Sequence, residues 1–273
     1  MGVPKIKSLV IAALVLINAF FLTFIIKDNS DDARFERQAV ENVCTVLRSG
    51  GIMVSPDDVA AGGSLRTMRA SRGLGAEGVI ADTFLGPAVM TDQGNIYHYE
   101  SDRGAASFYI GGDFEISLNE DVVIIKGGAM RTARRLLRDM RIEISEISVS
   151  GSTGNETVTA VCAYKKTSIF NCPIEFAFSG GSLKTVKGRY VTGIEPSEDG
   201  AEILSAGTAL LRFFAAVRNG EWECSRIDSV KAGYQSLVAG SFGDGIIAPA
   251  WLINADTGRY IINDATGEIR LLP

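Results

Sequence analysis

The fold class follows from Ala129-Met-Arg-Thr-Ala-Arg-Arg-Leu-Leu-Arg-Asp-Met-Arg141 and from the segment directly after it, Ile142-Glu-Ile-Ser-Glu-Ile-Ser-Val149. In the first part, apolar residues recur at helical steps: Met130, Ala133, Leu137 and Met140. This spacing predicts an amphipathic helix over 129–141. The second part is rich in β-branched residues, which suit a pleated, half-buried surface, and it therefore predicts a strand.

Further strand-like segments lie on both sides of this unit. Three of them, rich in Val, Ile, Thr and aromatic residues, follow it: Thr157–Tyr164, Ile174–Phe178 and Val186–Val191. Before it, Gly78–Phe84 and Asn95–Tyr99 are interpreted as short strands. The tail from Arg226 to Leu272 returns to strands, with turn signals at Asp256-Thr-Gly258 and Asp264-Ala-Thr-Gly267.

Two further helices are predicted. One runs from Asp31 to Arg48 and places apolar residues on one face: Phe35, Ala39, Val43 and Val46. The other starts near Ser197, a good N-cap residue, and buries residues at steps of three or four: Ile203, Gly207, Leu210, Phe214 and Val217. Helices segregated between runs of antiparallel strands indicate an α+β fold rather than alternating parallel βαβ units.

The expected organisation has three parts. Residues 1–27 form a cytoplasmic tip and a transmembrane anchor, and residues 28–120 form a first extracytoplasmic α+β domain. Residues 121–273 form a second domain, which either stays one unit or divides into two helix-plus-strands units at 121–193 and 194–273.

The anchor is the clearest physical signal in the chain. Ser8–Ile26 is almost wholly apolar and uncharged, and at about 1.5 Å per residue it can cross roughly 30 Å of hydrocarbon. Lys5 and Lys7 precede it, and acidic residues soon follow it: Asp28, Asp31 and Asp32. The positive charges predict a cytoplasmic N-terminus and an extracytoplasmic body on a single-pass protein of the cell membrane. No small-x-small cleavage site follows Phe24, so an uncleaved anchor is favoured over a signal peptide.

One stripe of the anchor would let a second helix approach closely, because small residues recur along it: Ser8, Ala12, Val15, Ala19 and Thr23. Asn18 lies beside the stripe, where its amide would gain about 1 kcal/mol by bonding to another helix. These residues predict a helix–helix interface. The alternative is a plain tether that tolerates one polar residue.

A basic face is predicted on the helix over 129–141, where five arginines fall at helical spacing: Arg131, Arg134, Arg135, Arg138 and Arg141. This face is the best local candidate for contact with an acidic partner. The alternative is a solvated helix surface whose arginines pair with neighbouring carboxylates. Nucleic acid is not expected as the partner, because the whole chain carries a net charge of -5.

No catalytic, cofactor or metal site is predicted, and no small-molecule ligand is identified. His98 is the single histidine, and no GxSxG motif accompanies it. Gly73-Leu-Gly-Ala-Glu-Gly78 matches GxGxxG, but residues 64–72 are interpreted as a loop and Val79 onward as a strand, so the strand and helix of a dinucleotide site are missing.

Four cysteines are spread along the chain without a CxxC motif, which argues against zinc: Cys44, Cys162, Cys172 and Cys224. Cys162 and Cys172 fall on neighbouring predicted strands. They could form a disulfide in an exported domain or remain two buried free thiols.

The C-terminal part carries three spaced motifs: Gly233-Tyr234, Pro249-Ala-Trp251 and Tyr260-Ile-Ile-Asn-Asp-Ala-Thr-Gly-Glu268. The N-terminal part carries Leu16-Ile-Asn-Ala-Phe-Phe-Leu22 and, at a helix end, Leu47-Arg-Ser-Gly-Gly-Ile52. Over nearly its full length the chain resembles the YycI family, membrane-anchored regulators associated with the YycG/WalK sensor histidine kinase of low-GC Gram-positive bacteria. It departs from that pattern at Leu252, where arginine is common, and in a glycine-rich stretch over 240–245.

The resemblance implies a non-enzymatic protein that modulates a sensor histidine kinase of a two-component system for cell-wall homeostasis, beside a YycH-type companion. Trp251 and Tyr260 would then pack the last hairpin onto a sheet, and Gly267 would supply the turn before the last strand. The ending also looks like a PepSY module, which implies an alternative function as an inhibitor or folding factor of an exported peptidase. A third reading is a secreted hydrolase with an unrecognised site.

We predict that the anchor is retained in the mature protein with its N-terminus in the cytoplasm, because Lys5 and Lys7 precede Ser8–Ile26. N-terminal sequencing of protein extracted from membranes should find the chain intact across the apolar segment. A soluble mature chain that begins near Asp28 would contradict this prediction.

Overall fold

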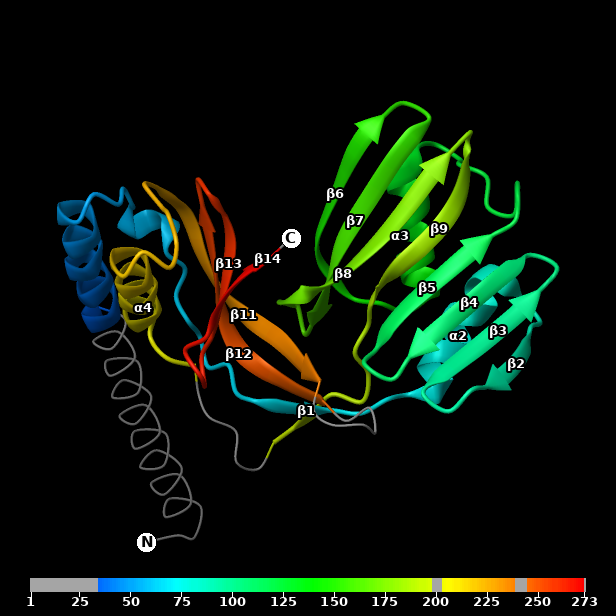
Figure 1. The fold of residues 1–273 in the computed structure, drawn as a ribbon, viewed down its shortest axis with the longest axis horizontal. Coiled ribbons are helices and arrows are strands. Elements are labelled where there is room, and N and C mark those ends of the chain that lie inside the picture. Colours follow the sequence, from blue (N-terminus) through cyan, green and yellow to red (C-terminus); the bar gives the residue numbers. More distant parts are fainter. Residues whose placement is uncertain (1–33, 198–202, 239–244, 273) are drawn as a thin grey trace, which may run out of the picture.

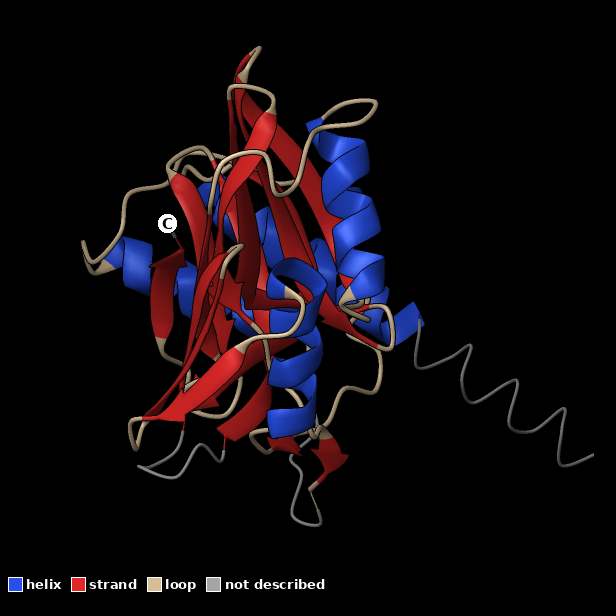
Figure 2. Cartoon of the chain, turned by 90° about the vertical axis from the view of Figure 1, so that its right-hand side faces the viewer, coloured by secondary structure: helices blue, strands red, loops and turns tan. Residues whose placement is uncertain are grey.

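The computed structural model describes residues 34–197, 203–238 and 245–272, and over these residues it confirms the α+β fold. Two lobes lie next to each other (Figure 1). We call residues 74–189 the large lobe, and residues 34–70 with 195–272 the small lobe. Figure 2 shows the same chain coloured by secondary structure, with helices lying along the strands.

The large lobe is an antiparallel sheet with two helices, and its strand order is β2-β3-β4-β5-β9-β8-β7-β6. Its elements are α2 (Leu74–Leu85), β2 (Val89–Asp92), β3 (Ile96–Ser101), β4 (Gly104–Tyr109), β5 (Asp113–Leu118), α3 (Ala129–Asp139), β6 (Ile144–Ser152), β7 (Asn155–Tyr164), β8 (Thr167–Ser179) and β9 (Ser182–Arg189). The predicted helix over 129–141 is therefore confirmed as α3, and the predicted strands after it as β6–β9.

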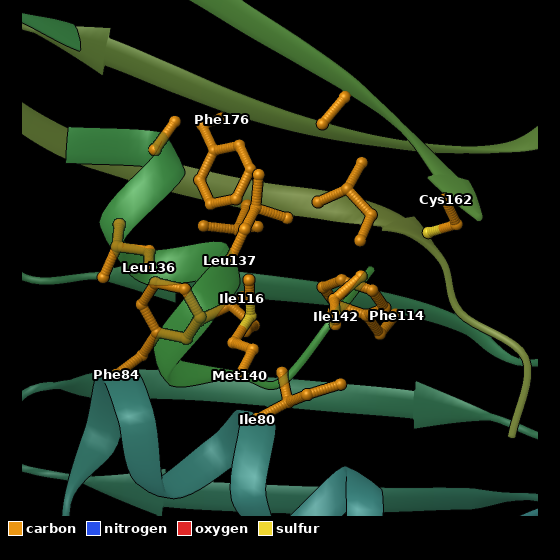
Figure 3. Close-up of a cluster of buried hydrophobic side chains, with 14 of the residues drawn as sticks. Ile80, Phe84, Phe114, Ile116, Leu136, Leu137, Met140, Ile142, Cys162 and Phe176 are labelled. Atoms are coloured by element: carbon orange, nitrogen blue, oxygen red, sulfur yellow. The ribbon is translucent and has the colours of Figure 1, made fainter. Parts of the chain in front are cut away.

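One face of this sheet is covered by α2 and α3 and the other face is open. Along β8, buried residues alternate with partly exposed ones, which is the period of a strand with one face in a core. The covered face packs Ile80 and Phe84 of α2, Leu137 of α3, Ile116 of β5 and Phe176 of β8 into one core (Figure 3). Because α2 and α3 share this core, the cores do not divide at the expected boundary near residue 120.

The small lobe contains a helix over residues 34–49, as predicted, and a sheet built from distant parts of the chain. The predicted apolar face of this helix is wrong, because Phe35 and Val46 are exposed and the core contacts come from Val40, Cys44 and Leu47. The other elements of the small lobe are the 3₁₀ helix η1 (Pro56–Asp58), β1 (Met68–Ala70), β10 (Glu195–Pro196), α4 (Ala206–Arg218), β11 (Ile227–Val238), β12 (Gly245–Ala255), β13 (Gly258–Asn263) and β14 (Ile269–Leu272). The two predicted turns of the tail join β12 to β13 and β13 to β14.

Strand β12 is the centre of the small lobe, because both of its faces are buried. Trp251 and Ile253 pack against the two helices of this lobe, whereas Ala250 and Leu252 face Phe170 of the large lobe. Burial on both faces explains why β12 is a nearly continuous apolar run rather than an alternating one.

The two lobes are joined where β8 meets β11. Their backbones pair in parallel at one position, Tyr234 with Ile169. Two residues further on, the Asn171 side chain makes the hydrogen bonds in place of a paired backbone. Its Nδ2 donates to the Ser236 carbonyl oxygen at 2.8 Å, and the Ser236 N–H donates to Asn171 Oδ1 at 2.8 Å. The amide thus satisfies both backbone groups of a residue in β11 where no partner strand does so.

The structure corrects the interpretation of Gly78–Phe84 as a strand, because this segment belongs to α2. Gly75 and Gly78 destabilise a helix by about 1 kcal/mol each relative to alanine. Their presence made the helical pattern of this segment hard to recognise from the sequence. The buried residues of α2 nevertheless keep helical spacing: Glu77, Ile80, Ala81, Phe84 and Leu85. Packing of this stripe against β3 and β4 outweighs the weak local propensity.

The start of the last helix was also predicted wrongly. Ser205, not Ser197, is the N-cap of α4, and its side chain accepts a hydrogen bond from the Thr208 N–H. Ile203 therefore precedes the helix instead of lying on its face. Phe213 is the fully buried phenylalanine of α4, while Phe214 is only partly buried.

We predict that Asn171→Ala destabilises the protein by about 2 kcal/mol, because the N–H and C=O of Ser236 lose their partner in a partly buried place. For a chain of this size, the unfolding midpoint should fall by roughly 4–8 °C. The matched control is Asn119→Ala, which removes one exposed side-chain bond to Asp102 and should cost about 0.5 kcal/mol or less. Equal midpoints for the two variants in thermal unfolding would refute the role given to Asn171.

Candidate functional site

The predicted basic face lies on the solvent side of α3, except that Arg141 follows the C-cap Met140 and is not part of the helix. All five of its arginines are exposed: Arg131, Arg134, Arg135, Arg138 and Arg141. The opposite stripe of the helix is buried on the large-lobe sheet: Ala129, Thr132, Ala133, Leu136 and Leu137. Because the helix buries its apolar stripe completely, the arginines contribute little to the core and are directed to solvent.

These arginines make no ion pair within 4.0 Å in the part of the chain that the structure describes. Some of them border a surface depression of about 410 Å³ beside α3. Three arginines and three apolar residues line it: Arg131, Arg134, Arg138, Leu137, Ile142 and Ile144. Cationic walls around an apolar floor suit a partner that offers carboxylates next to an apolar side chain.

The GxGxxG segment, Gly73–Gly78, does have a strand before it and a helix after it, contrary to the sequence interpretation. However, β1 runs antiparallel to both of its neighbours, so it starts no parallel βαβ unit. Arg72 and Glu77 fill the turn with a part-buried ion pair of 2.6 Å, and the Arg72 guanidinium also lies 4.3 Å from the Tyr97 ring centroid. The remaining cavity of about 40 Å³ has no room for a dinucleotide.

The side chains considered for chemistry lie apart from one another. His98 is half-buried in β3 and its Nδ1 lies 3.1 Å from the Ser107 Oγ of β4. Among the described residues, no group of three or more His, Cys, Asp or Glu side chains is placed to hold a metal ion.

Cys162 in β7 and Cys172 in β8 are both buried free thiols on neighbouring strands. Burial raises the pKa of the Cys162 thiol well above its usual range and that of Cys172 to about 12. Both therefore remain protonated and unreactive at neutral pH. Cys44 is also a buried free thiol, and Cys224 is a partly exposed one.

The C-terminal motif residues all have structural positions. Trp251 is fully buried and its indole N–H donates to the Leu204 carbonyl oxygen at 3.2 Å. Tyr260 packs against Phe213 and Trp222, with ring centroids 5.0 and 5.2 Å away. Gly267 turns the chain into β14 with a φ of +73°, which few other residues adopt.

Two further motif residues shape the strands at the junction of the lobes. A Cβ on Gly233 would overlap the Phe170 ring, so the close approach of β8 to β11 requires glycine here. Tyr234, which follows it, is buried and forms the one backbone pair between the described residues of β11 and β8. Pro249 lies in β12 between the stretch that pairs with β1 and the stretch that pairs with β13, so its missing N–H costs no ladder bond.

The predicted anchor lies outside the described residues, and so do the residues predicted to form its helix interface: Ser8, Ala12, Val15, Asn18, Ala19 and Thr23. A search of the helices in the described part of the chain finds none that is long and apolar enough to cross a membrane.

Comparison with known proteins matches the fold but no family. No protein-family model matches the chain, and no curated protein matches it. An uncharacterized protein from Eubacterium rectale, solved as a crystal structure, is 9% identical with a TM-score of 0.51, over 77% of this chain and 87% of that one. The Bacillus megaterium YpeB C-terminal domain is 13% identical with a TM-score of 0.38, over 75% of this chain and 99% of that one. The first match supports the fold, and neither structure is described as a YycI protein.

The Asp264 carboxylate of the last motif holds the chain in place just before α4. Its Oδ2 accepts a hydrogen bond from the Leu204 N–H at 2.8 Å, and its own carbonyl oxygen accepts one from Arg212 at 3.2 Å. Together with the Trp251 indole, this fixes both backbone groups of Leu204 just before α4. Burial raises the pKa of the Asp264 carboxyl above its ordinary value, because desolvation disfavours the charged form.

We predict a pH-dependent difference between the wild type and Asp264→Asn. Since the folded pKa is raised, the carboxyl contributes most stability below its unfolded pKa of about 3.9 and loses that contribution as pH rises through the folded pKa. The asparagine cannot titrate, so the free energy of unfolding of the wild type relative to the variant should decrease from about pH 3.5 to about pH 7. Urea unfolding at several pH values measures this difference. A difference that stays constant with pH would contradict the prediction.

Proposed function

We propose that this protein is a non-enzymatic, membrane-anchored regulator that binds a sensor histidine kinase outside the cytoplasm, with the arginine face of α3 as one contact surface. The observation that carries the proposal is that five exposed arginines make no ion pair among the described residues, and that three of them border a depression with an apolar floor. Such a surface suits an acidic protein segment. The resemblance to YycI supplies the kinase as the partner.

Stability gives no reason for this arrangement of charge. Like charges at helical spacing repel one another. An exposed ion pair between one of these arginines and a carboxylate would stabilise the fold by only about 0.2–1 kcal/mol. An acidic partner offsets the repulsion, and the apolar floor adds contact area that a solvated helix would not use. The stripe of small residues in the anchor, beside Asn18, supports a second contact within the membrane.

Regulation follows if the two contacts fit one kinase state better than the other. A bound protein shifts an equilibrium only by the difference between its affinities for the two states. The body and the anchor would therefore act together. The body would bind the kinase outside the membrane, and the anchor would bind its transmembrane helices with an affinity that depends on their arrangement. A YycH-type companion would bind beside it.

We predict that Arg134→Glu with Arg138→Glu weakens binding of the full-length protein to the full-length kinase in detergent micelles by about tenfold at low ionic strength, and less at moderate ionic strength. Both arginines are exposed, so the free energy of unfolding should change by only about 0.5 kcal/mol. The matched control is Arg34→Glu with Arg218→Glu, which reverses two exposed helical arginines elsewhere and should leave binding intact.

Equal affinities for the two double variants at both salt concentrations would disprove a role for the α3 face. A chimera with an unrelated transmembrane helix tests the second contact, and unchanged recovery of the kinase would confine binding to the extracytoplasmic body. Recovery of an exported peptidase in place of the kinase would favour the PepSY-like alternative.

A further inference from the structure

A second candidate site lies between the lobes, in a cleft of about 600 Å³. One wall is the open face of the large-lobe sheet, formed by β5, β7, β8 and β9, and the other is formed by Arg259 of β13 and Leu272 of β14. Figure 1 shows β14 and the C-terminal end of the chain turned toward the large lobe. The cleft is independent of the α3 face, because α3 covers the opposite side of the same sheet.

The floor of the cleft is apolar. Phe170 is 4% exposed and belongs to the small core at the lobe junction, against which Leu272 packs. Val161 and Pro173 continue the apolar surface on paired positions of β7 and β8. This floor would bury one or two apolar side chains of a ligand.

The walls carry both signs of charge, and most of these charges are already paired. Arg189 and Asp113 form a two-bond pair at 2.9 and 2.7 Å, and Lys187 lies 3.3 Å from Glu175. Glu115 on the large lobe and Arg259 on the small lobe remain, and neither makes an ion pair within 4.0 Å among the described residues. The two charges that can pair with a ligand are thus opposite in sign and stand on opposite lobes.

The charges on the walls determine which class of ligand fits the cleft. A polyanion would meet the carboxylates of Asp113, Glu115 and Glu175, and a purely apolar ligand would leave Glu115 and Arg259 desolvated without partners. A ligand that carries both charges around an apolar centre satisfies the floor and both walls. Strand β14 pairs only with β13 in the described part of the chain, so its other edge can bond to an extended backbone.

We propose that the cleft binds a short extended peptide segment, with an acidic side chain paired to Arg259, a basic one paired to Glu115 and apolar side chains on the floor between them. The backbone of the segment would add a strand to the free edge of β14. This site goes beyond the proposed contact with a kinase through α3 and does not depend on it.

The test is affinity selection from a pool of randomised hexapeptides with capped ends, using the full-length protein in detergent micelles. Capping ensures that only side chains carry charge. The wild type should enrich peptides that have one acidic and one basic residue at a fixed separation, at least tenfold over the pool. Arg259→Glu should select a basic residue where the wild type selects an acidic one, and Glu115→Lys should select the reverse at the other position.

The double variant Arg259→Glu with Glu115→Lys keeps the number of charges and should select the same spacing with the two signs exchanged. Arg218→Glu with Glu223→Lys, which reverses two exposed charges away from the cleft, should select like the wild type. No enrichment by the wild type, or any selection by the double variant other than the exchanged order, would overturn the proposal. The α3 arginines are unchanged in all of these proteins, so failure here leaves the proposed kinase contact untouched.

Discussion

The arrangement of this protein depends on one strand, β8, which serves both lobes. Its C-terminal half is an ordinary inner strand of the large-lobe sheet, whereas its N-terminal half reaches the small lobe through the pair of Ile169 with Tyr234. Backbone pairing with β11 stops there, and the Asn171 amide continues it with a side chain. Phe170, between these two contacts, packs onto β12 and forces glycine at position 233. Three successive residues therefore set how the lobes meet.

Sequence reasoning recovered the elements whose pattern is local. The apolar stripe of α3 and the β-branched run of β6 needed no partner to be recognised, and both were predicted. Strand β8 was predicted only over Ile174–Phe178, because Asn171 and Pro173 have low strand propensity and their positions depend on contacts with distant residues. The α2 helix was missed for the same kind of reason, since its glycines obscure a stripe that only the packed sheet makes favourable.

The two candidate surfaces, the α3 face and the cleft, also differ in whether a local sequence pattern predicts them. Four arginines of the α3 face lie within one helix, so their spacing alone places them on one side, whereas Arg141 follows the end of the helix. The cleft draws Glu115, Pro173 and Arg259 from strands that lie far apart in the chain. Neither the charges nor the apolar floor form a motif in the sequence. Only the pairing of β5 with β9 and of β9 with β8 brings the large-lobe residues into one row across the sheet.

The two surfaces lie on opposite faces of one sheet, which limits how one could influence the other. Along β8, Ile174 and Phe176 point into the core beneath α3, while Pro173 and Glu175 line the cleft. A shift of β8 by one residue would exchange these faces and expose the core, so coupling through a change of strand register is too costly. The lobe junction is different, because it has one backbone pair and otherwise consists of side-chain contacts: the Asn171 amide, the packing of Phe170 on β12 and the ion pair of Lys231 with Glu146. A peptide bound between Glu115 and Arg259 would bridge the lobes and favour one angle between them. Rotation about the β8–β11 junction is thus the motion through which binding in the cleft would change the position of the α3 face relative to the small lobe.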